Sequence, residues 1–177
     1  MGLFFRRFIG VLALDASIFE EIEADRRASL HAVAVVIAAA AGGRVAAIEL
    51  GLAQSDSYIV AALIGLGAIV VWVTAVAALG TYALARPQTH SNMQELLRTI
   101  GFAAAPGVFL SLAAIRPAAP VVVGIVLIWM IATTVIAVRQ SLDYLETWRA
   151  VAVCVLAALL SLGSIAALIA LLGRNVS

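Results

Sequence analysis

Two charged residues, Arg44 and Glu49, interrupt the apolar stretch AGGRVAAIEL at residues 41–50. On one helix, residues five apart point about 140° away from each other, so these two side chains are not expected to pair within their own helix. The neighbours of Arg44 on the helical wheel are all small: Ala40, Ala41, Ala47 and Gly51. Small residues allow another helix to approach closely. Because an arginine inside a bilayer costs about 3 kcal/mol on insertion scales, we expect Arg44 to have a partner there.

We interpret Arg44 as a structural residue whose hydrogen-bonding groups are satisfied inside a helix bundle. Its partners would then be backbone carbonyls near Pro106 or a hydroxyl group of Thr74, Ser111, Thr133 or Thr134. The main alternative is a carboxylate outside the chain, either Glu49 of a second copy or a residue of another membrane protein. Glu49 itself lies near the end of the apolar run, where solvation by water is expected.

Pro106 and Gly107 interrupt a second apolar run. Proline removes a helix hydrogen bond and clashes with the preceding turn, so the helix should break there. Broken helices at membrane depth line substrate sites in many transporters, but that architecture expects a matching interrupted segment in a second repeat. The sequence shows no such partner, which favours a kink that serves packing.

Residues suited to enzyme chemistry are sparse. The two histidines, His31 and His90, have no His, Cys or Asp companion at metal-ligand spacing. The single cysteine, Cys154, lies in an apolar run and excludes an intrachain disulfide. No Gly-x-Ser-x-Gly motif is present. We therefore predict a protein that is not an enzyme and that holds no metal or cofactor.

The composition predicts an integral membrane protein. Of the 177 residues, 64% are hydrophobic and only 12% are charged, whereas about a quarter are charged in soluble domains. The net charge of +1 gives no indication of nucleic-acid binding. A bilayer core requires about 20 apolar residues in a helix. Five runs approach this length: Ala28–Leu52, Tyr58–Ala85, Thr99–Ile115, Ala118–Val138 and Ala150–Leu172.

The predicted fold is therefore an all-α integral membrane protein, in which five transmembrane helices form one bundle over residues 28–177 and an amphipathic interfacial segment occupies residues 1–27. The arginines predict its orientation, because basic residues favour the cytoplasmic side. Five spans place eight arginines on one side: Arg6, Arg7, Arg26, Arg27, Arg86, Arg98, Arg139 and Arg149. The other side has only Arg116 and Arg174. The N-terminus is expected in the cytoplasm and the C-terminus outside.

The interfacial segment should contain two helices. In the first, Phe4, Phe5, Phe8, Val11 and Leu12 would enter the acyl boundary while Arg6 and Arg7 reach the lipid head groups. The second should begin near Ser17, which has Glu20 at capping-box spacing. Its acidic residues, Glu20, Glu21, Glu23 and Asp25, either fold back onto Arg86, Arg98, Arg139 or Arg149 or form a solvated face.

Two further stretches have helical periodicity. In SNMQELLRTI, Ser91 and Gln94 have capping-box spacing, Met93, Leu96, Leu97 and Ile100 form an apolar stripe, and Gln94, Glu95 and Arg98 cover the opposite side. In RQSLDYLETWR, the spacing predicts an Arg139–Asp143 pair and a Glu146–Arg149 pair. Tyr144 and Trp148 suit an aromatic belt at the interface.

The stretches GTYALAR, ELLRTIGFAAAPGVF and AVRQSLDYLETWRA occur in this order in the chain. Together they resemble the bacterial branch of the Yip domain family of five-span membrane proteins. The matched residues are Thr81, Tyr82, Glu95, Leu96, Arg98, Ala105, Pro106, Arg139, Leu142, Arg149 and Ala150. The resemblance implies the fold and a scaffold-like role. Eukaryotic members bind Rab-type GTPases, a property that we do not transfer to this chain.

The predicted function is a non-catalytic scaffold or accessory subunit in the bacterial cytoplasmic membrane. Its partners would be the lipid bilayer and another integral membrane protein, a larger membrane complex or a second copy of the chain. The alternative is a small permease or lipid-handling protein that uses the Pro106 break and Arg44.

Overall fold

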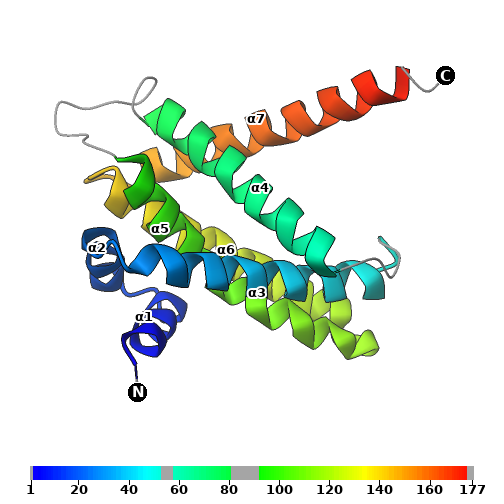
Figure 1. The fold of residues 1–177 in the computed structure, drawn as a ribbon, viewed down its shortest axis with the longest axis horizontal. Helices are drawn as coiled ribbons and strands as arrows, with labels where there is room; N and C mark the ends of the chain where they lie inside the picture. The colour runs from blue at the N-terminus through cyan, green and yellow to red at the C-terminus, as the bar shows by residue number, and fades with distance from the viewer. Residues whose placement is uncertain (1, 53–57, 81–91, 175–177) are drawn as a thin grey trace.

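The structure is a computed structural model that describes residues 2–52, 58–80 and 92–174. Within these residues all regular elements are helical and none is a strand. In chain order they are α1 (Leu3–Leu12), α2 (Ala16–Ala24), α3 (Ala28–Glu49), α4 (Tyr58–Ala78), α5 (Met93–Ala103), η2 (Ala105–Ala114), η3 (Arg116–Ala118), α6 (Ala119–Ser141) and α7 (Thr147–Arg174). Figure 1 shows α1 and α2 together at one end of a layer that contains α3, α5 and α6, with α4 crossing that layer.

Three segments of the described chain are long and apolar enough to cross a membrane: Ala28–Glu49, Met93–Ala114 and Arg116–Ser141. The second of them joins α5 to the 3-10 helix η2, so the stretch SNMQELLRTI leads directly into a candidate span. The other two apolar runs predicted from the sequence also contain helices, since α4 has 21 residues and α7 has 28.

The helix starts differ from the predicted capping boxes by one or two residues. The cap of α2 is Asp15, whose carboxylate accepts hydrogen bonds from the backbone N–H and the hydroxyl of Ser17. The cap of α5 is Asn92, whose side chain accepts from the backbone N–H of Gln94. Asp and Asn are as effective as Ser in satisfying the free amides of a first helical turn. The predicted cap Ser91 lies outside the described residues.

The Pro106 break is a packing feature in the structure. α5 ends at Ala103, and the 3-10 helix η2 follows with Pro106 in its first turn. The Gly107 N–H donates to the Ala104 carbonyl at 2.8 Å, while the Thr133 hydroxyl of α6 donates to the Ala103 carbonyl at 2.7 Å. These bonds satisfy backbone groups that the change of helix type releases, so Pro106 is buried without opening a polar gap.

η2 packs closely against α3 through glycine. A Cβ atom built on Gly42 would lie 2.6 Å from the Gly107 carbonyl oxygen, and one built on Gly107 would lie 2.8 Å from the Ala39 Cβ. Backbone atoms of η2 occupy the space at Gly42, and the side chains of Ala39 and Met130 occupy it at Gly107. This close approach uses Ala39 and Gly42, which lie on a different side of α3 from Arg44 and the small residues that the sequence placed beside it.

The main core lies where α1, α2, α5 and α6 meet. Its largest fully buried side chains include Val11, Phe19, Ile22, Leu96, Ile100, Phe102, Val138 and Leu142. Two polar contacts tie the same elements together. The Trp129 indole N–H donates to the Leu12 carbonyl at 3.0 Å, and the Thr99 and Ser141 hydroxyl oxygens lie 2.6 Å apart. Val11 therefore belongs to the core, although the sequence predicted it at the acyl boundary.

Candidate functional site

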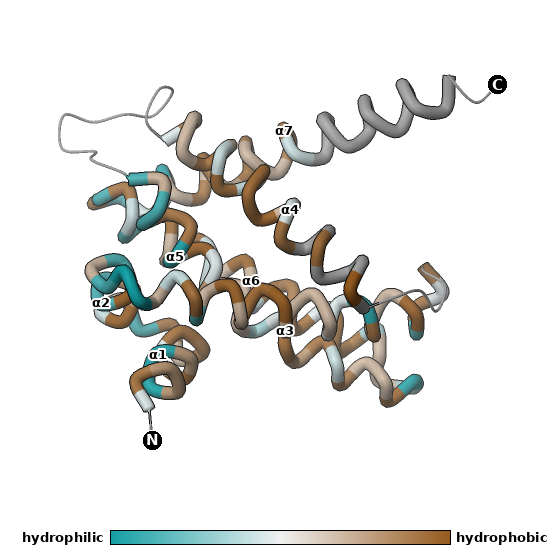
Figure 2. Tube along the Cα trace, in the orientation of Figure 1, coloured by the Kyte–Doolittle hydropathy of each residue, from teal (hydrophilic) through white to brown (hydrophobic). Residues whose placement is uncertain are grey.

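Many of the described hydrophilic residues gather at the end of the bundle that contains α2 and the start of α5 (Figure 2). There Arg7 of α1 is only 2% exposed. Its Nε donates to Glu21 Oε1 at 2.9 Å, and its Nη1 lies 2.8 Å from Asp25 Oδ2. Arg6, which is largely exposed, pairs with Glu21 as well. Arg7 thus joins α1 to α2 and does not reach head groups, contrary to the sequence prediction.

These contacts stabilise the ionised carboxylates. The pKa of Glu21 is lowered, chiefly by the hydrogen bond from Arg6 and also by Arg7. The pKa of Asp25 is lowered by the backbone N–H of Arg27 first and by Arg7 second. Both groups therefore favour a folded α1–α2 hairpin at neutral pH.

A second buried cation, Arg98 of α5, lies against the other side of α2. It is 4% exposed, and its Nη2 donates to the backbone carbonyl oxygen of Glu23. The nearby Glu23 carboxyl has its pKa raised to about 7, first by burial and then by the carboxylates of Glu95 and Asp143, with Arg98 opposing the shift. Arg98 was predicted on a polar outer side of its helix, and the structure buries it instead.

The acidic cluster of α2 thus divides between several partners. Among the expected cations that the structure describes, Arg98 hydrogen-bonds to α2, and it does so through the backbone carbonyl of Glu23. Glu20 accepts from the Gln140 side-chain amide at 2.7 Å, while Glu21 and Asp25 pair with the arginines of α1. Within the described ranges, no ion pair joins the cluster to Arg139 or Arg149. Arg86 lies outside the described residues.

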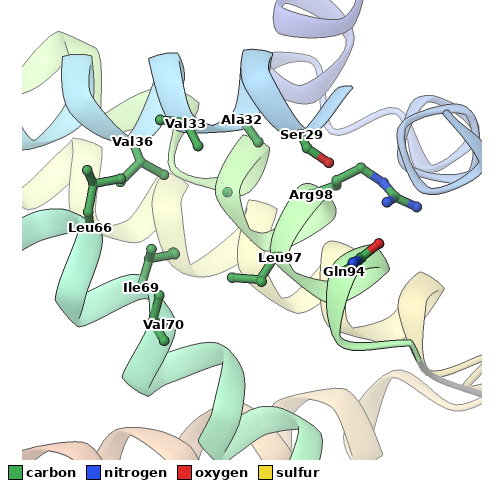
Figure 3. A pocket seen from close by; sticks show the side chains of 11 residues that line it. Ser29, Ala32, Val33, Val36, Leu66, Ile69, Val70, Gln94, Leu97 and Arg98 are labelled. Atoms are coloured by element: carbon green, nitrogen blue, oxygen red, sulfur yellow. The ribbon is translucent and has the colours of Figure 1, made fainter. Parts of the chain in front are cut away.

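Two cavities lie between the helices. The first, of about 460 Å³, adjoins this polar end and lies between α3, α4 and α5 (Figure 3). The second, of about 630 Å³, continues along the same helices and also meets α6 and Ser161 of α7. Val36 and Ile69 line both cavities. The polar residues of the first cavity, Ser29, Gln94 and Arg98, come together at one end of it, while Val33, Val36, Leu66, Ile69 and Val70 form the remainder.

At the opposite end of α3, Glu49 forms an ion pair with Arg116, with Oε2 and Nε 2.8 Å apart. The prediction that water alone solvates Glu49 is therefore wrong, although Arg116 itself is highly exposed. Arg44 is partly buried on α3 and is not left without an interaction partner. Neither Arg44 nor Pro106 lines the two cavities between the helices.

Of the two ion pairs predicted in the α6–α7 connection, the Glu146–Arg149 pair is present. Arg149 Nε lies 3.1 Å from Glu146 Oε2, and the Arg149 guanidinium lies over the Trp148 ring. Arg139 instead donates to the Tyr144 carbonyl at 3.2 Å, because Asp143 adopts a positive φ of 51° that turns the chain sharply. Trp148 is exposed as a belt residue would be, but Tyr144 is buried and donates to the Gly80 carbonyl.

Glu95 and Tyr82 were also predicted as candidate residues. Glu95 is half-buried on α5, close enough to Glu23 to raise the pKa of that carboxyl. Tyr82 lies outside the described residues. Arg7 and Glu23 were not predicted as site residues, because a short amphipathic helix and an acidic run are each explained more simply by a position at the membrane interface. The signal that could have indicated their contacts was the presence of opposite charges on two adjacent short helices.

Among the residues that the structure describes, no group of three His, Cys, Asp or Glu side chains is placed to hold a metal ion. The arrangement instead offers a buried ionic end, two apolar cavities and exposed apolar helix faces. No family model matches the chain, and no curated protein or solved structure matches it either.

Proposed function

We propose that this chain is a five-span protein of the bacterial cytoplasmic membrane, with its N-terminus in the cytoplasm and its C-terminus outside. Three helices have the required length and apolar character, and α4 and α7 exceed the roughly 20 residues that a bilayer core requires. The side that holds most of the arginines also holds the ionic end of the bundle. The resemblance to the Yip family implies the same number of spans.

In this arrangement α1 lies at the cytoplasmic interface. Leu3, Phe5 and Ile9 are 46%, 52% and 62% exposed, whereas Arg7 faces α2. An amphipathic helix of this kind inserts its exposed apolar side among the acyl chains near the head groups. The apolar surface that contacts lipid therefore differs from the set that the sequence predicted, since Val11 is buried in the core.

We further propose that the protein is a non-catalytic scaffold or accessory subunit that packs against another membrane protein or a second copy. The supporting observation is a stripe on α6, the α6 outer face, made of Val121, Gly124, Ile125, Ile128 and Ile131. All five residues are exposed and recur every three or four positions, so they share one side of the helix. Gly124 has no heavy atom within 4 Å of a built Cβ, which leaves space for a second helix to approach closely.

The permease alternative has less support. Pro106 is buried with its neighbouring carbonyls satisfied, and it lines neither cavity between the helices. A transport site built on this break would require the polar gap that the η2 packing closes.

The test compares the wild type with Gly124→Leu and Gly67→Leu after purification in mild detergent. Both glycines have open space around a built Cβ, so both variants should fold. We expect the wild type and Gly67→Leu to retain one stoichiometric partner or a dimer, measured by native mass spectrometry, and Gly124→Leu to lose it. A wild type that is monomeric and without a partner in native membranes would refute the scaffold role.

A further inference from the structure

The cavity between α3, α4 and α5 has an unequal distribution of polar groups. Ser29, Gln94 and Arg98 gather at one end, and the apolar residues of α3 and α4 occupy the other (Figure 3). Both Ser29 and Gln94 are exposed, so this end is open to water or to lipid head groups. The apolar end leads to the second cavity through the shared residues Val36 and Ile69. A ligand that fits this space is polar at one end and has a long apolar tail.

The size of the cavity favours a flexible chain over a protein helix. A cylinder 10 Å wide, the diameter of a helix with side chains, would fill about 460 Å³ in roughly 6 Å, which is about one turn. Both volumes fall within the range of small-molecule sites, which are typically apolar with a few polar groups that fix orientation. Val33 and Val70 line the first cavity and are 42% and 53% exposed, so the space also opens at the side of the bundle.

We propose that one phospholipid of the surrounding bilayer binds here, with an acyl chain along the groove between α3 and α4 and its phosphodiester at the polar end. This inference rests on the membrane location proposed above, but not on the scaffold role. Ser29 and Gln94 supply neutral donors to the phosphate oxygens. Arg98 supplies a positive charge near them; its guanidinium is turned toward α2, where Nη2 donates to the Glu23 carbonyl oxygen, so it attracts the phosphate through its charge without a direct hydrogen bond (Figure 3).

The tail is tested with the full chain in phosphatidylcholine vesicles that contain phosphatidylcholine with a photoreactive acyl chain. We expect adducts on the α3 and α4 residues of the cavities, and about fivefold fewer of them in Val33→Trp, which fills the space from an exposed position. Gly67→Leu, whose Cβ has open space and whose longer side chain narrows the second cavity, should lower them as well. The control Ile128→Trp adds the same ring on the α6 outer face and should leave the cavity adducts unchanged.

The head group is tested with Gln94→Glu and Gln94→Lys, using a diacylglycerol that carries the same photoreactive chain as the comparison lipid. The glutamate should lower phosphatidylcholine labelling about fivefold by repelling the phosphate, the lysine should not lower it, and diacylglycerol labelling should not distinguish the two variants. Gln94 is exposed, so neither substitution disturbs the core.

Three outcomes overturn the proposal: cavity labelling that is insensitive to Val33→Trp, equal effects of both Gln94 variants on phosphatidylcholine, or a partner helix that crosslinks to Val33 in place of lipid. Absence of labelling everywhere, the α6 outer face included, would instead refute the membrane location. If the experiments refute only the scaffold role, the expected pattern of lipid labelling is unchanged.

Discussion

Arg7 and Arg98 are both removed from water at the same end of the bundle, but different groups compensate their charges. Arg7 has two carboxylates within 3 Å, whereas Arg98 donates to a backbone carbonyl beside a partly buried carboxyl group. Removing one partner of a buried ion pair is costly, because the other charge loses its compensation. Arg7 therefore holds the N-terminal hairpin together, whereas Arg98 positions α2 on α5.

The first prediction compares the two arginines of α1. Arg7→Ala should lower the free energy of unfolding by about 2–3 kcal/mol, since it leaves Glu21 and Asp25 without their shared buried cation. Arg6→Ala removes an exposed partner of Glu21 and should change stability little. Thermal unfolding in detergent, together with protease cleavage between α1 and α2, measures both effects. Equal losses in the two variants would contradict this role of Arg7.

The second prediction concerns Glu23. Because its pKa is raised from 4.5 to about 7, the folded state favours the protonated carboxyl; its contribution to stability is most favourable below pH 4.5 and is lost as the pH rises through 7. Solvent partly screens this half-buried group, so Glu23→Gln should stabilise the fold by about 1 kcal/mol at pH 8, or about 2–4 °C in melting temperature.

The same Glu23→Gln substitution should give no gain at pH 4.5, where the wild-type carboxyl is already largely protonated when folded. Glu20→Gln is the comparison on the same helix: Glu20 is exposed, and a glutamine there can still accept from Gln140. Its charge is the smallest contribution to the raised pKa of Glu23, so its gain at pH 8 should be clearly smaller. A gain at pH 8 that persists at pH 4.5 would show that the effect is not one of titration.

At the scale of elements, the contact between α3 and η2 organises the centre of the bundle. Gly42 and Gly107 let the two backbones approach within van der Waals distance, and the Pro106 break places η2 on that surface. Close packing of this kind gains dispersion energy but tolerates no added atoms. The break at Pro106 and the two glycines are therefore both needed for the close packing of η2 on α3.

The third prediction uses two adjacent glycines of α3. Gly42→Ala places a Cβ 2.6 Å from a backbone carbonyl and should destabilise the fold by about 2 kcal/mol. Gly43→Ala meets only Leu110 Cδ1 at 3.8 Å and should be neutral or stabilise by about 0.5 kcal/mol, because alanine favours the helix. Melting temperatures in detergent distinguish the two. If Gly42→Ala is as stable as Gly43→Ala, the α3–η2 contact is looser than described.

At the scale of the whole molecule, charge and apolar surface are separated along the bundle. The ionic end contains the arginines of α1, together with α2 and the start of α5, where Figure 2 shows many hydrophilic residues. The α6 outer face and the exposed sides of α3 and α4 are apolar. A bilayer accommodates this distribution if the ionic end faces the cytoplasm, where basic residues are retained during insertion.

The fourth prediction is the topology itself. With five spans, fusions of alkaline phosphatase, which is active only outside the cytoplasm, should be active after the C-terminus and inactive after residue 143. Cysteines introduced at exposed Ala24 or Gln94 in a Cys154→Ala background should react with impermeant maleimide only after the cells are permeabilised. Active fusions at both positions would exclude the five-span arrangement.

The apolar and polar segments predicted from the sequence correspond well to the helices, because hydropathy and helical period are local properties. The runs at 28–52, 118–138 and 150–172 lie over α3, α6 and α7 with small differences in their ends. The Glu146–Arg149 pair was also predicted correctly, since one helical turn separates the residues. The Arg139–Asp143 pair failed, because the chain leaves the helix before Asp143.

The sequence by itself determined the helical class and the apolar segments, since both depend on neighbours a few positions apart. Only the tertiary structure decided the partners of the charges: Arg98 meets Glu23 across 75 positions, and Glu49 meets Arg116 across 67. The cavity between α3, α4 and α5 is likewise decided by the tertiary structure. Its walls come from three helices whose relative rotation is set by the packing of the whole core, and no local pattern contains that information.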